Sequence, residues 1–443
     1  MNLKINFNHI YISVFSLYFF FWGVDLYQIK FFSFLKNDYF NSFRLSYLIL
    51  LLFIPIFYDL KKNIFSIKKL FNYQQYIIFF IIFIVLHFFF VRTFYGEIID
   101  PSEIASLFYL IFLSIIYCHY RNFIQDNFKK ILTFYLIIFV LYSVFETKIY
   151  NHGQCNSDLF IIDIIRTYLK IYLTNSIYIE NSHLAIMSIA VFFSSLFILL
   201  NDKKKNILFL VLFLIEIIIV LNNLSTTYFV CYFLVQIILL FLLKKNNRKF
   251  WVITILFLFI NSYLFLSDKN CTEKVTAFSG KNIIKQNIGR DVNLTTSIYE
   301  RSFIVVIDTF KNYQFGWGIE GMDNAINKLM NRPKYLIKIK DKKNEYNHIY
   351  FQSRLLNLKD GLSNSLKMFT EFGFFTFIIF YFFLRYILNI KNIKSYNIFI
   401  IALFITMCVR SAGYYNGGFI FCLLEFFYLK KNIDQLKSVN QNN

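Results

Sequence analysis

Four arginines late in the sequence are candidates for binding a phosphate group: Arg290, Arg301, Arg354 and Arg410. Arginine suits phosphate because its guanidinium stays charged and donates two parallel hydrogen bonds to phosphate oxygens. Arg301 stands in "YERSFIVVIDTF", whose apolar spacing predicts an amphipathic helix that ends at the glycine-rich "FGWGIEG". Arg410 ends an apolar run and precedes Gly413, Gly417 and Gly418, where backbone can approach a ligand closely.

We predict that Arg301 and Arg410 bind the anion, whereas the case for Arg290 and Arg354 is evenly balanced. The alternative for Arg301 is a surface ion pair with Glu300 or Asp308. The alternative for Arg410 is that its side chain only reaches from an apolar helix end to the membrane interface.

Three other side chains could accept a proton. In "ENSH", Glu180 and His183 lie three residues apart, so a helix would place both on one face. Either could act as a general base, although the same residues also suit a helix N-terminus as caps. His348 lies in a long polar segment, where it is either the general base of the reaction or simply an exposed residue. No Cys/His spacing resembles a metal site. The sequence leaves undecided whether Cys155 and Cys271 form a disulfide, because it does not give their distance.

The composition places these residues in a membrane protein. Of 443 residues, 57% are hydrophobic and 16% are charged, and the mean hydropathy is +0.52. A globular core of this size could not bury so large an apolar fraction, so we expect an all-α polytopic membrane protein. Runs of about 17–25 apolar residues predict about twelve spans, near 8–24, 40–58, 75–92, 103–119, 129–145, 183–200, 206–221, 225–243, 249–266, 367–388, 396–412 and 414–429.

The basic residues predict the orientation of these spans. If both termini are cytoplasmic, each inner loop carries three or four Lys or Arg, and the short outer loops carry none to two. Much of the net charge of +20 is therefore a topology signal, and nucleic-acid binding is not indicated. We expect spans 1–9 within 1–266, a large outer loop at 267–365, spans 10–12 within 366–430 and a cytoplasmic tail at 431–443.

Two outer segments are too long to serve only as connections. The loop at 267–365 has a net charge of +6, which favours an anionic ligand. In the segment 146–182, Asp163, Arg166 and Lys170 would form one polar stripe on an otherwise apolar helix. That pattern predicts a helix lying in the membrane interface, or else a poorly inserted span.

Four short motifs stand out: "ENSHLA", an outer Arg followed by "FGWG", "SLKMFTEFGFFTF" and "RSAGYYNGGFIF". Combined with about twelve helices and one late outer loop, they resemble the O-antigen polymerase and ligase group. These are bacterial membrane proteins that assemble surface polysaccharide, and they include the Wzy-type polymerases. The chain departs from the group at Ser363-Asn364, where many relatives have His-Asn. That departure leaves the role of His348 open.

The resemblance implies that the protein polymerises polyprenyl-pyrophosphate-linked repeat units at the periplasmic face of the bacterial inner membrane. A sugar hydroxyl would attack the anomeric carbon and lipid pyrophosphate would leave, with arginines in place of a metal and no cofactor. The implied partners are the lipid-linked glycan, membrane lipids, a chain-length regulator and a flippase. The implied residues are Arg301, Arg410, His348, Glu180 and His183 for catalysis, and Arg290, Arg354, Arg166, Gly316, Gly318 and Gly417 for substrate binding.

Three alternatives remain. A ligase that moves finished polymer to a lipid A core would have nearly the same layout. A lipid-linked oligosaccharide flippase would need a polar central path and often internal repeats, and the sequence shows no repeat. A metal-dependent lipid-sugar glycosyltransferase would usually carry a carboxylate pair in the first outer loop, where Asp25 and Asp38 stand apart.

Overall fold

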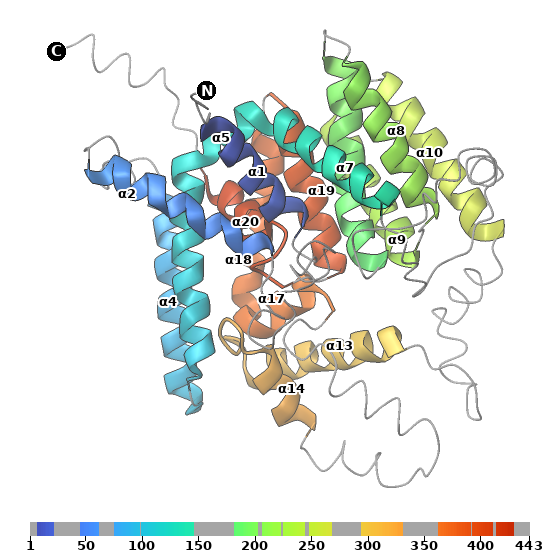
Figure 1. The fold of residues 1–443 in the computed structure, drawn as a ribbon. Coiled ribbons are helices and arrows are strands. Elements are labelled where there is room, and N and C mark those ends of the chain that lie inside the picture. Colours follow the sequence, from blue (N-terminus) through green and yellow to red (C-terminus); the bar gives the residue numbers. More distant parts are fainter. Residues whose placement is uncertain are drawn as a thin grey trace, which may run out of the picture.

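The computed structural model describes residues 7–21, 45–61, 75–97, 99–145, 181–202, 206–222, 225–243, 248–267, 294–330, 362–390, 392–410 and 413–428. Within these ranges the regular elements are all helices (Figure 1). They are α1 (Phe7–Phe20), η3 (Leu45–Leu52), α2 (Phe53–Lys61), α4 (Gln75–Tyr95), α5 (Pro101–Phe145), α7 (Asn181–Asn201), α8 (Ile207–Asn222), α9 (Thr226–Leu242), α10 (Arg248–Ser267), α13 (Leu294–Asn312), α14 (Met322–Met330), α17 (Asn364–Phe372), η4 (Gly373–Phe375), α18 (Thr376–Asn389), α19 (Ser395–Val409) and α20 (Phe419–Phe427).

Four described helices are long and apolar enough to cross a membrane: Gln75–Tyr95, Pro101–Tyr142, His183–Asn201 and Asn364–Asn389. Shorter apolar helices include Phe7–Phe20, Ile207–Leu221, Thr227–Leu242 and Ser395–Val409. Large apolar side chains are exposed on the outward faces of α4, α8, α10 and α18, for example Phe79, Leu210, Phe259 and Leu384. Such faces are stable against lipid, so the predicted class of an all-helical membrane protein is supported.

The centre of the molecule is built around α19, which is apolar on all sides. It packs against α7 and α9, and its residues from Ile398 to Met407 are buried. A helix that is apolar all round is stable only inside a bundle or a bilayer. α1 packs on α5 and η3 beside this centre, where Phe20 stacks on Tyr135 with ring centroids 4.4 Å apart.

One expectation about the spans is corrected. The sequence predicts separate spans at 103–119 and 129–145 with an inner loop between them, but the structure has the single 45-residue helix α5. No glycine or proline follows Pro101 in this segment, so nothing in the backbone interrupts the helix. Its central polar residues also find partners, because Arg121 pairs with Glu425 and Lys129 pairs with Asp202.

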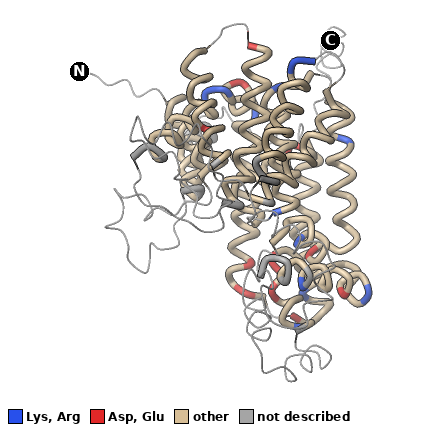
Figure 2. The backbone as a smooth tube through the Cα atoms, turned by 90° about the vertical axis from the view of Figure 1, so that its right-hand side faces the viewer, with Lys and Arg blue, Asp and Glu red and all other residues tan. Residues whose placement is uncertain are grey.

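Part of the predicted outer loop is also folded. α13 and α14 lie together at one end of the helical body, next to α17 (Figure 1). They share a small apolar core of their own, made of Val305, Trp317, Met322, Ala325, Ile326 and Leu329. Charged residues gather at this end and at the opposite end, while the middle of the body is mostly uncharged (Figure 2). The predicted loop is therefore a helical surface layer over this part of its length.

Candidate functional site

The short helix α17 carries an unusual buried polar face. Asn364, Lys367 and Glu371 follow one another at spacings of three and four, so they lie on the same side of the helix. All three are at most 1% exposed. Burying charged groups is costly unless they are paired, so this face predicts close polar partners on the neighbouring elements.

The glycine-punctuated turn after α13 is docked on the end of α17 by backbone hydrogen bonds. The Trp317 N–H donates to the Thr370 carbonyl at 3.0 Å, and the Gly318 N–H donates to the Glu371 carbonyl at 2.8 Å. The backbones are so close that a Cβ on Gly316 would lie 2.3 Å from the Glu371 carbonyl oxygen. Gly316 also has φ +83°, a conformation that favours glycine.

This docking brings Glu320 to the buried face of α17. The Lys367 Nζ lies 3.3 Å from both carboxylate oxygens of Glu320 and 3.8 Å from Oε1 of Glu371. It also lies 4.6 Å from the centre of the Tyr414 ring, in the turn that leads to α20. One buried ammonium thus joins two carboxylates and an aromatic ring from three different parts of the chain.

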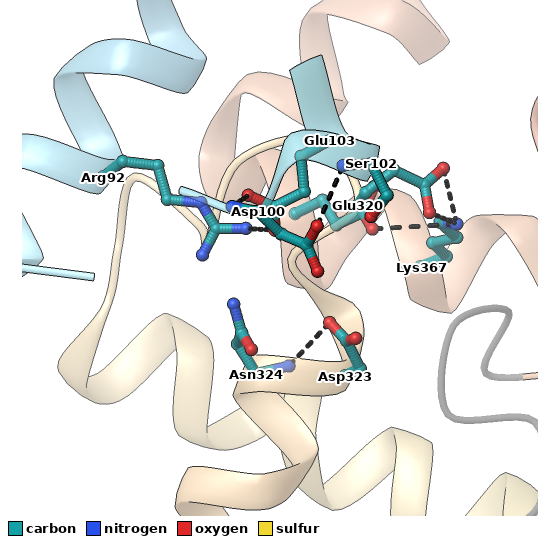
Figure 3. A network of polar contacts seen from close by, with 9 residues as sticks. Arg92, Asp100, Ser102, Glu103, Glu320, Asp323, Asn324 and Lys367 are labelled. Atoms are coloured by element: carbon teal, nitrogen blue, oxygen red, sulfur yellow. Dashed lines mark hydrogen bonds and ion pairs between the residues drawn. The ribbon is translucent and has the colours of Figure 1, made fainter. Parts of the chain in front are cut away.

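Glu320 lines a cavity of about 470 Å³ between the start of α5 and the start of α14. Its lining residues are Ile99, Asp100, Pro101, Ser102, Glu103, Ser106, Glu320, Asp323 and Asn324. The buried Arg92 pairs with Glu103 on one side, and Lys367 pairs with Glu320 on the other (Figure 3). Four carboxylates face two cations here, so the cavity is acidic and rich in hydrogen-bond acceptors.

At the other end of α17, three elements converge at the end of α19, where Arg410 is located. The Tyr299 hydroxyl, on α13, donates to the Val409 carbonyl at the end of α19, at 2.5 Å. Burial raises the pKa of Tyr299 to about 12, and Arg410 lies close enough to oppose part of that rise. Arg301 follows Tyr299 by two residues and is 4% exposed.

Serine hydroxyls fix the start of α17 to the same place. The hydroxyls of Ser363 and Ser365 donate to the Cys408 carbonyl at 2.6 and 2.8 Å, and Ser363 also caps α17 by accepting from the Leu366 N–H. The N-terminus of α17, with its positive dipole end, therefore lies beside the end of α19. We call Arg301, Arg410 and this helix start the arginine junction.

The structure describes only some of the predicted site residues. Arg410 lies beside Tyr299 of α13, and Arg301 is buried on α13 two residues further along. Gly316 and Gly318 form the docked turn, Gly417 has φ +61° in the turn before α20, and His183 is partly buried at the start of α7. The remaining predicted site residues lie outside the described residues: Glu180, Arg166, Arg290, Arg354 and His348. The two cysteines of the suggested disulfide, Cys155 and Cys271, also lie outside them.

Sequence reasoning missed Glu320, Lys367 and Glu371. The signal available was the i,i+4 pair Lys367–Glu371 at the entry to an apolar span, where charge is expensive. Glu320 gave no local signal beyond its place in the glycine-rich turn. Among the described residues, no group of three or more His, Cys, Asp or Glu could hold a metal ion.

Comparison with protein-family models, with curated proteins and with solved structures gives no match. The fold and site define the class of this protein by themselves. In the part of the chain that the structure describes, it is all-helical, with helices of membrane-spanning length and a polar site under a helical surface layer.

Proposed function

We propose that this protein is a membrane glycosyl-transferring enzyme that polymerises polyprenyl-pyrophosphate-linked oligosaccharide repeat units into a surface polysaccharide. The observation that supports this proposal is the arginine junction, where α13, which carries the buried Arg301, is bonded through Tyr299 to the end of α19, which carries Arg410, beside the N-terminus of α17. Two arginines on elements that meet at a helix N-terminus suit a doubly charged phosphate group.

In the proposed reaction, a hydroxyl oxygen of one repeat unit attacks the anomeric carbon of another. The new oxygen–carbon bond forms while the bond from that carbon to the pyrophosphate oxygen breaks, and the electron pair leaves with the pyrophosphate. Arg301 and Arg410 stabilise the negative charge that builds up on the leaving oxygens. The acidic cavity supports the acceptor side, because carboxylate oxygens accept hydrogen bonds from sugar hydroxyls.

Both regions of the proposed site include residues of α17. α17 has nine residues and is therefore about 13 Å long. The arginine junction lies at its first turn, and Lys367 with the cavity residue Glu320 lies one turn further along. A lipid-linked donor and a glycan acceptor can thus approach each other along one short helix.

The proposal includes the topology predicted by the basic residues. The chain would cross the bacterial inner membrane several times, with α5 as one continuous helix in place of two predicted spans, and with α13 and α14 at the periplasmic surface. The apolar face of α13, with Phe303 and Ile307 exposed, suits contact with acyl chains of the bilayer. A chain-length regulator and a flippase remain proposed partners.

The first test is a gel of surface glycolipids from cells that lack the gene, with and without its restoration. Loss of the polymer ladder, with a single repeat unit still attached to the core, supports the polymerase. Loss of all core modification, with polymer accumulating on the lipid carrier, would identify a ligase instead. An unchanged profile would refute both and favour a transporter.

The second test changes the arginines. We expect Arg301→Ala and Arg410→Ala each to reduce polymer formation by about 10²–10³-fold, the effect of removing one donor to a developing negative charge. Lysine at either position should restore only part of the activity, because it cannot bind phosphate bidentately. Arg385→Ala is the matched control, since Arg385 stacks on Tyr76 and Phe382 in α4 and α18, away from the junction. Normal polymer from both alanine variants would contradict the proposal.

A further inference from the structure

Glu320 has a backbone conformation that its residue type disfavours. Its φ is +59°, and within the described part of the chain the only other non-glycine residue with positive φ is Leu362. The positions around it use glycine for such conformations, at Gly316 and Gly318. A strained non-glycine residue persists where the surroundings fix it, which is often at a functional site.

The surroundings of Glu320 fix its side chain toward the cavity. Lys367, which is 1% exposed, lies 3.3 Å from both carboxylate oxygens, so the carboxylate is held from α17. The side chain of Glu320 keeps 15% of its surface accessible, and it contributes to the cavity wall. A glycine at this position would relieve the backbone but would remove that carboxylate.

The other carboxylates of the cavity have structural partners close by. Asp100 accepts from the Ser102 N–H at the start of α5, and Asp323 accepts from the Asn324 N–H at the start of α14. Glu103 is 5% exposed and is paired with the buried Arg92. Glu320 is the cavity carboxylate that is oriented by α17, the same helix that meets the arginine junction.

Glu320 and the arginine junction are both attached to α17. Lys367 of this helix holds the Glu320 carboxylate and lies 4.6 Å from the centre of the Tyr414 ring, while the serines at its start bind the end of α19. A general base must reach the hydroxyl whose proton it accepts. Glu320 is suited to that role because its carboxylate is part of the wall of the acidic cavity.

We propose that Glu320 is the general base of the transfer and that Lys367 is a positioning residue that aims its carboxylate into the cavity. This inference rests on the proposed function. The acceptor hydroxyl gives its proton to Glu320 as its oxygen bonds to the anomeric carbon, and the electron pair of the broken bond leaves with the pyrophosphate. Glu320 returns to its charged form by losing the proton to water.

The test uses membranes that contain the full-length protein and lipid-linked repeat units. Glu320→Gly relieves the backbone at φ +59°, which offsets part of the cost of leaving the buried Lys367 with Glu371 as its carboxylate partner, and thermal unfolding of the variant checks that it folds. Polymer formation should nevertheless fall by about 10²–10⁴-fold, the usual contribution of a general base. Added formate should restore part of this activity, since it can occupy the space of the missing carboxylate and accept the proton. Asp308→Asn is the matched control, because Asp308 is a partly exposed acid on α13 that does not line the cavity.

Two further variants test the positioning role. Lys367→Arg should keep more activity than Lys367→Met, because arginine still pairs with Glu320 whereas methionine only fills the space. Formate should not rescue Lys367→Met, in which the carboxylate is present but misdirected. Equal activity of the two Lys367 variants would refute the role of Lys367.

The outcomes separate this inference from the proposed function. If restoring the wild-type gene makes polymer and Glu320→Gly makes it equally well, Glu320 is not the base and the polymerase assignment stands. If Glu320→Gly is inactive and formate gives no recovery, the base assignment is also overturned. If deletion of the gene leaves the surface polysaccharide unchanged, the proposed function itself fails.

Discussion

The side chain of His87, in the middle of α4, donates a hydrogen bond from Nε2 to the carbonyl oxygen of Phe315, at 2.7 Å. His87 is 5% exposed and Phe315 belongs to the turn that follows α13. This bond ties a helix of membrane-spanning length to the surface layer that covers the polar site. The ring also packs against Phe372 and Phe375 at the end of α17.

We expect His87→Leu to loosen the turn after α13. The substitution removes the donor and leaves the Phe315 carbonyl without this partner, which should cost about 1–3 kcal/mol. The loss can be measured as a lower thermal midpoint in detergent, with faster proteolysis near Trp317. His9→Leu is the control, because His9 is exposed on α1. Equal loss in both variants would argue against the bond.

Gly316→Ala should destabilise the docked turn more than Gly96→Ala does. Both glycines have positive φ, +83° and +65°, so both substitutions pay a similar conformational cost of about 1–2 kcal/mol. Only at Gly316 would the new Cβ meet backbone, 2.3 Å from the Glu371 carbonyl oxygen, whereas nothing lies within 4 Å at Gly96. Thermal unfolding of the two purified variants gives the comparison, and equal midpoints would contradict the docking.

Tyr299→Phe should destabilise the arginine junction at neutral pH, because the Val409 carbonyl loses its donor. The pKa of Tyr299 is raised by burial to about 12, against about 10 in an unfolded chain. The folded state therefore holds the proton more tightly, and this contribution is complete below pH 10 and is lost as the pH rises toward 12.

The difference in unfolding free energy between wild type and Tyr299→Phe should consequently stay constant up to about pH 10 and narrow between pH 10 and pH 12, measured by thermal unfolding. Tyr263→Phe serves as the control, because Tyr263 is 73% exposed. A difference that stays constant over this upper range would show that Tyr299 does not titrate as the structure implies.

The ion pair between Arg121 and Glu425 joins α5 to α20. A double-mutant cycle on the free energy of unfolding should give this pair a large coupling energy. Arg121 donates from Nε and Nη2 to the two carboxylate oxygens, at 3.0 and 2.5 Å, and Glu425 is 1% exposed. Arg121→Met or Glu425→Leu alone should cost about 3–5 kcal/mol, because each leaves a buried charge without this partner. The double variant should recover most of that loss.

The exposed pair Lys394–Asp126 is the matched control for this double-mutant cycle. Its atoms are 3.6 Å apart and its side chains are 57% and 69% exposed. Solvent screening should reduce its coupling to about 0–1 kcal/mol. Similar coupling energies in the two cycles would mean that burial does not set the strength of the Arg121–Glu425 pair.

The sequence alone determined most of the helices. Apolar runs of sufficient length predict them, and each predicted span that the structure describes overlaps a helix. The turn after α13 was also foreseen, since glycine is the residue that tolerates φ near +80° without cost. Both features depend on local properties, namely hydrophobic periodicity and backbone freedom, which can be read residue by residue.

The continuity of α5 was not foreseen, for a physical reason. A polar stretch between two apolar runs predicts a loop when its partners are unknown. The structure keeps Arg121 and Lys129 in a helix because Glu425 and Asp202 come from elsewhere in the fold to pair with them. Helix propensity permits continuity there, and tertiary contacts stabilise it.

Only the tertiary structure decided the polar site. His87 meets Phe315 across 228 positions of the sequence, and Lys367 meets Glu320 across 47. No periodicity within a helix encodes such a meeting, because it depends on how separate elements pack. Arg301 and Arg410 were singled out by their chemistry, but the packing of α13, α17 and α19 is what bonds Tyr299, two residues before Arg301, to the helix end that carries Arg410.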